Sequence, residues 1–356
     1  MQTYAMQTIL ERMGHNAVFI QKRNWPLNIK IKDLPIVYAK RIVKNMMGRN
    51  IPMSYEKIYN REAPIIRQNI ETFVSKHIKM KIVDDYRQIQ ENDFEAIVVG
   101  SDQIWRPLYV KHIENSFLDF AKDWDIKRVA YAASFGTDKW EYTKLQNAHC
   151  HKLVQLFNVV SVREKSGVGL CKEHFGVEAK HVLDPTMLLK AEDYIKLFEE
   201  NNTLKSTGDL LCYILDESEE KSKIIETIAS QGRLKTFHVS ARPYYKLDVP
   251  LEERVQPSVE TWLRGFYDAK FVVTDSFHAC VFSILFKKPF VVYGNKERGM
   301  SRFTSLLEMF GLQDRIVSGR SDLEEKLLKG IDWKMVYSNL DVRIKEANDF
   351  LGKALF

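Results

Sequence analysis

The chain has 356 residues, more than one ordinary hydrophobic core supports, so it is predicted to form two α/β domains. Hydrophobic residues make up 45% and charged residues 28%, which is typical of a soluble globular enzyme, and no apolar run is long enough to cross a bilayer. The polar start, Met1 to Thr3, excludes a secretory signal, and we expect a cytoplasmic protein.

The net charge of +6 is unevenly distributed along the chain. Residues 21–82 hold 14 Lys and Arg against 4 Asp and Glu. A surplus of this size suits an anionic partner, such as lipid headgroups, a diphosphate-linked substrate or nucleic acid. A solvated helical face is an equally simple explanation.

The first predicted element is a helix over residues 4–13 with an apolar stripe, and Gly14 caps its C-terminus. A short strand is predicted over residues 16–20. Residues 25–81 are predicted to be mostly helical and basic, with interruptions at the prolines, and to form an insertion rather than part of a regular sheet. These prolines are Pro26, Pro35, Pro52 and Pro64.

Residues 83–190 alternate short apolar runs with helical segments, which predicts a parallel sheet. The predicted strands are 96–99, 128–133, 158–162 and 181–183. Each strand is followed by polar or glycine residues. In open parallel sheets ligands bind at this edge, so these positions favour a site.

A second alternation begins near residue 210. Its predicted strands are 210–215, 234–239, 269–274 and 289–293, with helices over 218–230, 259–267, 276–286 and 301–310 between and after them. We therefore expect an N-terminal domain over 1–190, a C-terminal domain over 191–332 and a helical tail over 333–356 that packs back on the first domain.

The stretch Phe271–Phe290 carries the most informative candidate site. Asp275 and Ser276 are good N-cap residues after a buried strand, so His278 is predicted in the first turn of a helix. The N-terminus of a helix binds phosphate or carboxylate, and a histidine there can bind the anion or donate a proton. A histidine that merely caps a helix between domains is nearly as plausible.

Further cationic residues extend this candidate site. Arg163 follows a predicted strand, and its guanidinium fork suits a carboxylate or phosphate, although a surface salt bridge is the commoner role. Lys296, Arg298 and Arg302 form a third basic cluster, in which Lys296 and Arg298 precede a helix and Arg302 also fits its first turn.

The string Gly100-Ser101-Asp102-Gln103-Ile104-Trp105 is the second candidate. Gly100 would let a ligand approach the backbone, Ser101 and Gln103 would offer polar groups, and Trp105 would present a flat face to a sugar ring. Asp102 could act as base for a sugar hydroxyl. A tight turn with a capping Asp would give the same string.

Several other site types are not indicated. The sequence has no Walker phosphate loop, GxGxxG, GxSxG or CxxC pair, and the four scattered cysteines favour buried thiols. His149, Cys150 and His151 are adjacent and would point around a helix, so a structural role is favoured over zinc. Asp123-Trp124-Asp125 resembles a glycosyltransferase DxD but lies in a charged loop. We expect no metal.

Together these strings resemble the polysaccharide pyruvyl transferase family. The resemblance covers roughly residues 85–315, and the helix at residues 4–13 fits the opening helix of the family. The matching strings are GSDQIW (100–105), SFG (134–136), SVREKSG (161–167), VLDPTMLL (182–189), DSFHACVFSILFKKPFVVY (275–293) and GMSRFTSLLEMFGL (299–312).

The resemblance implies a GT-B-like pair of Rossmann-like domains, the first on the acceptor side and the second on the donor side. It implies transfer of the enolpyruvyl group of phosphoenolpyruvate to a sugar, formation of a pyruvate ketal and release of phosphate, with no metal or other cofactor. The histidine of the family falls on His278 and its early arginine on Arg163. A further basic group that contacts phosphate matches Arg298 or Arg302.

The acceptor implied is a sugar of a cell-surface polysaccharide or its lipid-diphosphate-linked precursor. With the basic insertion, this predicts a peripheral contact with the anionic inner leaflet and no nucleic-acid partner. Members of the family usually begin with a strand and a glycine-containing loop, whereas this chain begins inside the helix that follows. A missing first strand would remove one wall of the cleft, so we expect the activity of this chain to be doubtful.

Two other functions fit the same observations. One is a nucleotide-sugar-dependent GT-B glycosyltransferase, which would need a patch that recognises the base and ribose. The other is a basic adaptor without enzymatic activity that docks residues 21–82 on a membrane or an assembly complex.

Overall fold

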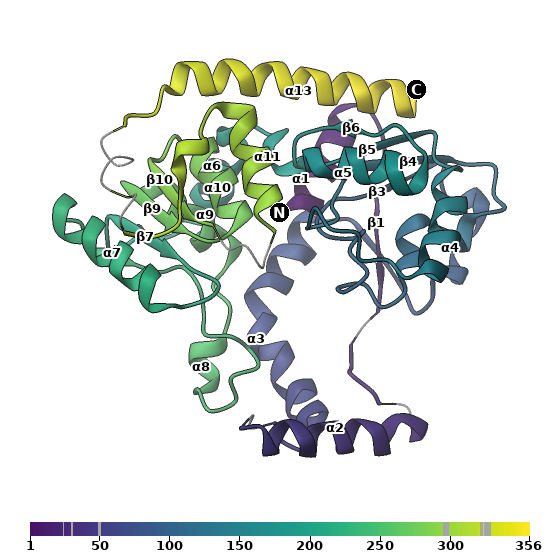
Figure 1. Ribbon diagram of the computed structural model, residues 1–356, viewed down its shortest axis with the longest axis horizontal. Coiled ribbons are helices and arrows are strands. Elements are labelled where there is room, and N and C mark those ends of the chain that lie inside the picture. The colour runs from purple at the N-terminus through teal and green to yellow at the C-terminus, as the bar shows by residue number, and fades with distance from the viewer. Residues whose placement is uncertain (24, 30, 49–50, 295–298, 321–322, 324–328) are drawn as a thin grey trace. The chain divides into compact units, whose positions relative to one another are not determined.

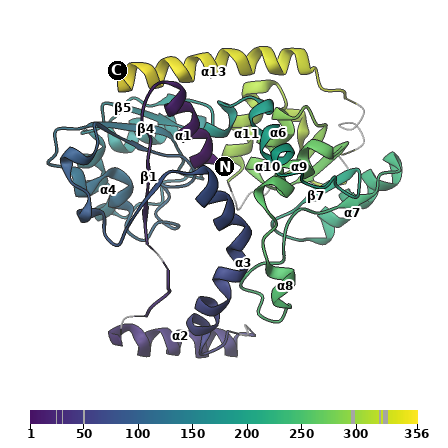
Figure 2. The same cartoon turned by 180° about the vertical axis from the view of Figure 1, so that it is seen from behind.

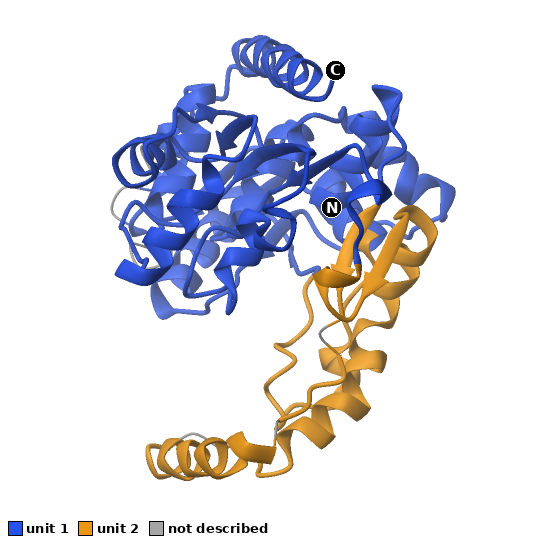
Figure 3. Ribbon diagram, turned by 90° about the vertical axis from the view of Figure 1, so that its right-hand side faces the viewer, with its two compact units in different colours: residues 1–17, 89–239, 260–356 blue, residues 18–88, 240–259 orange. Residues whose placement is uncertain are grey.

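The computed structural model of the chain describes residues 1–356 except 24, 30, 49–50, 295–298, 321–322 and 324–328. The described residues form two compact units, which Figure 3 distinguishes by colour. Unit 1 comprises residues 1–17, 89–239 and 260–356, and unit 2 comprises residues 18–88 and 240–259. The boundary expected near residue 190 falls inside unit 1, between its two sheets.

The first sheet of unit 1 has four parallel strands in the order β3-β4-β5-β6. Its strands are β3 (Ala96–Val99), β4 (Lys127–Ala133), β5 (Val159–Val162) and β6 (Lys180–His181). Each lies within two residues of a predicted strand. The parallel sheet expected from the alternation is therefore confirmed.

The second sheet of unit 1 is also parallel, with the order β11-β10-β9-β7-β8. Its strands are β7 (Leu210–Tyr213), β8 (Thr236–Phe237), β9 (Phe271–Thr274), β10 (Phe290–Tyr293) and β11 (Ile316–Val317). Read from β8, the strands follow the doubly wound order 2-1-3-4-5, whose switch point lies between β7 and β9. This switch point lies at the start of the stretch with His278.

Helices alternate with these strands along the chain (Figure 1). The helices of unit 1 are α1 (Gln2–Arg12), α4 (Lys144–Val154), α5 (Lys165–Leu170), α6 (Ala191–Glu200), α7 (Glu219–Gly232), α9 (Val259–Asp268), α10 (Phe277–Leu285), α11 (Met300–Phe310) and α13 (Trp333–Leu355). Gly311 ends α11 with a φ of 66°, a conformation that glycine adopts without strain.

The first sheet packs against an aromatic core that includes the side chain of Trp105. The indole stacks on Phe117 at 4.7 Å between ring centroids and meets Phe135 edge-on at 5.6 Å. Its Nε1–H donates to the Ser116 carbonyl at 3.2 Å. The segment between β3 and β4, all of which the structure describes, contributes Trp105 and Phe117 to this core, although it contains no long regular helix.

The C-terminal helix α13 runs alongside both sheets of unit 1 in both views (Figures 1 and 2), and it contacts α11 and β4. Near its start, Tyr337 donates a hydrogen bond to the Leu285 carbonyl at the end of α10, at 2.5 Å. At its end, the Leu355 carbonyl accepts from Lys127 Nζ at 2.8 Å, at the start of β4. The tail thus packs on the first sheet and on α10 as well.

The described residues of unit 2 include a parallel strand pair and three α-helices. These elements are β1 (Phe19–Lys22), β2 (Met80–Val83), α2 (Leu34–Met46), α3 (Tyr55–His77) and α8 (Leu251–Arg254). The segment 240–259 is fixed to α3, because Arg254 Nη2 donates to Glu62 at 2.9 Å and the Gln256 amide donates to the Ile66 carbonyl at 2.9 Å.

The prediction that Pro64 interrupts the helical region is wrong, because α3 runs through it. Because Pro64 has no backbone N–H, the carbonyl of Asn60 loses its helical hydrogen bond. The destabilisation is confined to this one turn of the helix. The Asn60 side chain forms two hydrogen bonds with the backbone of Leu27, at 2.7 and 2.9 Å. These contacts and those of Glu62 and Ile66 hold the helix on both sides of the proline.

A search for membrane-crossing helices gave none among the described residues, since no helix combines the required length with sufficient hydropathy.

Candidate active site

The polar residues that follow the strands of the first sheet come together at one sheet edge. Asp102 follows β3, Ser134 follows β4, Arg163 follows β5 and Asp184 follows β6. Strand order alone brings them close, since the carboxyl ends of parallel strands share an edge.

Arg163 lies at the centre of this group, and its side chain is fully buried. Its Nη1 donates to Asp184 Oδ2 at 2.7 Å, and its Nη2 lies 3.5 Å from Asp102 Oδ1. The guanidinium also lies over the ring of Phe277, 4.3 Å from the centroid. Burial opposes the charge, but the carboxylates of Asp184, Glu164 and Asp102 outweigh it and raise the pKa of Arg163.

Asp184 is the second buried charge and was not among the predicted site residues. Besides Arg163, its carboxylate accepts from Gln2 Nε2 at 2.7 Å and from the backbone and hydroxyl of Thr186 at 3.0 and 2.6 Å. Burial alone would raise the pKa of Asp184, but His278, Arg163 and Thr186 together hold it well below its ordinary value. The residue is therefore an ionised partner for Arg163 that also lies beside the His278 ring.

His278 is the second residue of α10, as predicted, and Ser276 is the N-cap of that helix. Its Nε2 lies 3.6 Å from Asp184 Oδ2, too far for a direct hydrogen bond, and has no hydrogen-bond partner in the described part of the chain. The side chain is 30% exposed. The exposed part of the imidazole therefore consists of ring atoms other than Nε2, and Nε2 is buried beside Asp184.

The start of α10 is fixed by Asp275 rather than by a capping side chain. The carboxylate of Asp275 accepts from the amides of Leu215 and Asp216, at 2.7 and 3.1 Å, just beyond β7. It also accepts from Lys221 Nζ of α7 at 2.6 Å, a pair that is almost fully buried. The predicted ligand residue Ser276 is buried, and its amide donates to Thr274 Oγ1 at 3.0 Å. These bonds join the ends of β7 and β9 at the switch point.

Of the predicted basic cluster, Lys296 and Arg298 lie outside the described residues. Arg302 is the third residue of α11 and half-buried. Burial and the charge of Arg163 lower the pKa of Arg302, while Glu164 and Asp102 act in the opposite direction. Arg302 thus shares the electrostatic surroundings of Arg163, and both belong to the same group of charges.

The first turn of α11 also lies against the first sheet. A Cβ atom added to Gly299 would lie 2.0 Å from the Gly136 carbonyl oxygen, so only glycine fits there. Its φ of 88° imposes the same requirement. The SFG turn after β4 and the start of α11 are therefore in close contact.

Within GSDQIW, the structure corrects two expectations. Trp105 is fully buried in the aromatic core and offers no face to a sugar ring. Gly100 does allow a close backbone approach, but by Tyr131, whose carbonyl oxygen would lie 1.9 Å from an added Cβ. Both residues serve packing because the turn after β3 folds inward over β4.

The polar residues of the same string are placed differently. Ser101 is buried and accepts from Gln2 Nε2 at 2.5 Å. Gln103 Oε1 accepts from Arg106 Nη1 at 3.1 Å. The side chain of Asp102 is 58% exposed beside Arg163, which leaves it accessible to a ligand.

Glu164 is a further buried acid that the sequence reasoning missed. It accepts a short hydrogen bond from the Ser134 hydroxyl and lies 3.8 Å from Arg163 Nε. Burial raises the pKa of Glu164, and Arg163 and Ser134 offset this only in part. The adjacent Arg163-Glu164 pair after β5 is the signal that could have indicated it.

The His149-Cys150-His151 string is structural, as expected. His149 pairs with Asp119, His151 contacts the His174 carbonyl, and Cys150 is fully buried. No group of three or more His, Cys, Asp and Glu side chains suited to a metal occurs in the residues that the structure covers.

The family model for polysaccharide pyruvyl transferase matches residues 1–297 of this chain. The search of curated proteins found no match to this chain. Among solved structures, a glycosyltransferase from Rickettsia africae ESF-5 is similar over 80% of this chain and 88% of its own length, at 9% identity and a TM-score of 0.47. The N-terminal domain of Candida albicans trehalose-6-phosphate phosphatase is similar over 98% and 88%, at 9% identity and a TM-score of 0.36. Likenesses at these scores say nothing about function.

Proposed function

This chain belongs to the polysaccharide pyruvyl transferase family, and we propose that it transfers the enolpyruvyl group of phosphoenolpyruvate to a sugar. The sugar would be part of a cell-surface polysaccharide or of its lipid-linked precursor. The products would be a pyruvate ketal and phosphate. The observation that supports this proposal best is the placement of Arg163 and His278 beside Asp184, with Arg302 in the electrostatic surroundings of Arg163.

This group of charges suits a compact, highly anionic donor. Arg163 and Arg302 would hold the carboxylate and phosphate of phosphoenolpyruvate, together with the amides at the start of α10. Asp184 and Asp102 neutralise Arg163. A donor carboxylate would replace the longer of these contacts, the one to the exposed Asp102.

The proposed reaction consists of an addition and then a displacement at one carbon atom. A proton from His278 goes to the methylene carbon of the donor, and a first sugar hydroxyl forms a C–O bond at the neighbouring carbon. Asp102 takes the proton of that hydroxyl. A second hydroxyl then forms the other C–O bond while the bond to phosphate breaks, and its proton leaves with phosphate. Cationic side chains supply the charge stabilisation, so the proposal needs no metal or other cofactor.

The proposal includes a GT-B-like pairing of the two sheets as Rossmann-like domains and a cytoplasmic location at the inner leaflet of the membrane. A lipid-diphosphate-linked acceptor would be available there. The basic composition of residues 21–82 supports this location.

The test is phosphate release from phosphoenolpyruvate in the presence of galactoside and N-acetylmannosamine conjugates, with the ketal identified by mass spectrometry. Replacement of His278 by Ala removes the proton donor, and the rate should fall by roughly 10²- to 10⁴-fold with folding retained. The exposed His112 on the same chain provides the matched control, and His112→Ala should leave the rate unchanged.

Ligand-dependent melting separates the two enzymatic readings. Phosphoenolpyruvate should raise the melting temperature of the wild-type protein and raise it less in Arg163→Met. If UDP or GDP stabilises the protein and phosphoenolpyruvate does not, the nucleotide-sugar alternative replaces this proposal.

A further inference from the structure

Helix α2 of unit 2 leaves an apolar face uncovered. Seven apolar residues on it and at its C-terminus are exposed, and these are Pro35, Ile36, Ala39, Ile42, Val43, Met46 and Met47. At 100° per residue they fill one continuous arc of about 140°. The arc contains no polar residue. A contiguous exposed face of this kind marks an interaction site.

The opposite side of α2 attaches the helix to unit 2 through a polar side chain. Arg41, the single buried residue of α2, donates to the Met53 carbonyl at 2.7 Å and forms a short hydrogen bond with Glu56. It also lies over the rings of Tyr38 and Tyr55. The helix is therefore held with its charged anchor inward and its apolar face outward, the reverse of an ordinary surface helix.

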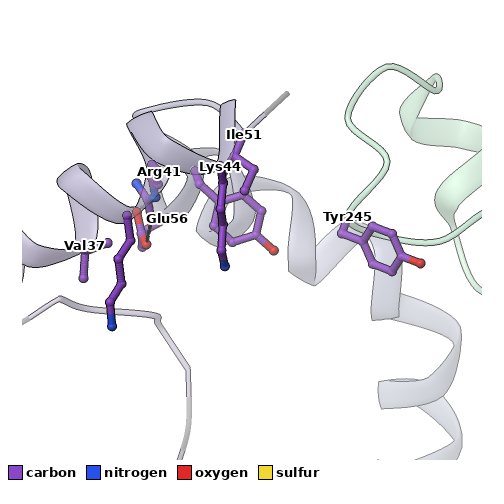
Figure 4. A pocket seen from close by; sticks show the side chains of 8 residues that line it. Val37, Arg41, Lys44, Ile51, Glu56 and Tyr245 are labelled. Carbon is purple, nitrogen blue, oxygen red and sulfur yellow. Dashed lines mark hydrogen bonds and ion pairs between the residues drawn. The ribbon is translucent and has the colours of Figure 1, made fainter. Parts of the chain in front are cut away.

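Positive charge borders the apolar face. Lys40 and Lys44 are exposed and follow the apolar arc directly around the helix, on one side. Both line an open pocket with walls formed by Val37, Ile51, Tyr55 and Tyr245, and Figure 4 shows Arg41 beside Glu56 in the same pocket. Residues 18–88 and 240–259 together carry 18 Lys and Arg against 9 Asp and Glu.

The positive charge that borders the apolar face of α2 indicates which partner would cover that face. A second copy of the chain would bring two like-charged lysine borders together, which is unfavourable. A bilayer with anionic headgroups offers both an apolar layer and the opposite charge. Helix α2 has 13 residues, about 20 Å, which is too short to cross a hydrocarbon core of about 30 Å. It would therefore lie in the plane of the interface.

We infer that α2 is an interfacial membrane-binding helix. Its apolar face enters the boundary between headgroups and acyl chains of an anionic phospholipid bilayer, and Lys40 and Lys44 contact the lipid phosphates. This inference does not depend on the chemistry proposed for unit 1. It does rest on the membrane location included in the proposed function. Its test measures lipid binding alone, so a failure would remove that location and leave the transfer reaction to its own test.

The first experiment is co-sedimentation of the full chain with vesicles of phosphatidylcholine, with or without one third phosphatidylglycerol. Binding should require phosphatidylglycerol and should weaken as salt is raised from 0.1 M, because screening shortens the range of the lysine charges. Val43→Asp should lower the partition coefficient at least roughly tenfold. Val342→Asp on α13 is the matched control, since both valines are 56% exposed, and it should have no effect.

The charge border is tested in the same assay. Each lysine near an anionic surface contributes roughly fivefold to binding, so Lys40→Glu with Lys44→Glu should lower the partition coefficient by roughly 25-fold or more. Lys334→Glu with Lys345→Glu, at exposed positions on α13, makes the same change in net charge elsewhere. Equal losses in the two double variants would show that net charge alone is responsible and would overturn the assignment of α2.

The second experiment places a polarity-sensitive fluorophore on the helix. All four native thiols are buried, and burial raises the pKa of Cys150 and Cys171 to about 12 and of Cys212 to about 11, so a new exposed thiol is labelled selectively. The emission maximum of the fluorophore on Met46→Cys should shift to shorter wavelength when anionic vesicles are added. The emission maximum of the same fluorophore on Leu145→Cys should not shift. The two side chains are 83% and 81% exposed.

A blue shift of the Met46→Cys label that appears without vesicles as protein concentration rises would instead indicate contact between copies of the chain. That result, or binding of Val43→Asp equal to that of the wild type, would overturn the inference.

Discussion

At the residue scale, the candidate site depends on carboxylates that neutralise buried cations. Asp184 accepts hydrogen bonds from Arg163, Gln2 and Thr186 and lies beside His278. Removing its charge leaves the Arg163 guanidinium buried with weaker partners. Such a loss is costly, since the charge has already been taken out of water.

Replacement of Asp184 by Asn should therefore lower the free energy of unfolding at pH 7 by roughly 3 kcal/mol. The folded-state pKa of Asp184 is depressed, so its contribution is complete above its ordinary value of 3.8 and is lost as pH falls below that value. The difference in the free energy of unfolding between Asp184→Asn and the wild type, measured by urea unfolding, should accordingly become smaller between pH 4 and pH 3. Asp102→Asn, which changes the exposed partner of Arg163, is the control. A difference in unfolding free energy between Asp184→Asn and the wild type that does not depend on pH would contradict this account.

Some of these roles could be predicted from local sequence and others could not. Arg163 directly follows a buried strand, and His278 lies in the first turn of the helix after another, so local position indicated both. Asp184 occupies the same kind of position, but its importance comes from Gln2 and His278, which lie far away in the sequence. Trp105 shows the opposite error, because a tryptophan beside polar residues has the same local pattern whether it faces a ligand or the core.

At the element scale, strand ends at the switch point are joined by the buried pair of Lys221 and Asp275. Asp275 holds the chain after β7 through two amides and directly precedes the first turn of α10. The pair therefore fixes the position of the helix that carries His278. Its effect on the reaction would be that of a positioning contact.

Replacement of Lys221 by Met should destabilise the protein by roughly 3 kcal/mol, because the Asp275 carboxylate stays buried without its cation. Lys223 on the same helix pairs with Glu219 at the surface, and Lys223→Met should leave the unfolding transition unchanged. Equal effects of the two substitutions in chemical denaturation would show that the buried pair does not have the importance assigned to it.

The regular elements were largely predictable because periodicity is a local property. Strands such as β3 and β9 are apolar runs bounded by polar or glycine residues, and their positions agree with the prediction. The two-residue β11 was not predicted, since it is defined by its pairing with β10. Helix α3 continues through Pro64 because contacts with residues distant in sequence hold it, and local rules do not include them.

At the scale of the whole molecule, the chain divides into compact units that are discontinuous in sequence. Unit 2 collects residues 18–88, which the basic surplus over 21–82 nearly outlines, and residues 240–259, which no compositional signal links to them. Sequence reasoning therefore placed a boundary near residue 190, between the two sheets. The contacts that unite 240–259 with α3, such as Arg254 with Glu62, are visible only in the fold.

Replacement of Glu62 by Ala should weaken the attachment of residues 240–259 to α3, because it removes the hydrogen bond from Arg254. Amide hydrogen exchange should increase in residues 240–259 and in the middle of α3, while β7 and β9 keep their protection. Glu71→Ala on the same helix removes an exposed pair with Arg67 and serves as the control. A uniform increase across both units after Glu62→Ala would show that the units unfold together.

The placement of α13 has a consequence for how unit 1 can move. The helix contacts the C-terminal end of α10, about 13 Å along its axis from the end that carries His278, and contacts the first residue of β4 rather than its carboxyl end. A hinge rotation about the axis of α13 would keep these contacts while it separates the strand ends that carry Arg163 and His278. Such a rotation would break the contact of Arg163 with Phe277 and that of Gly299 with Gly136, while each sheet stays intact.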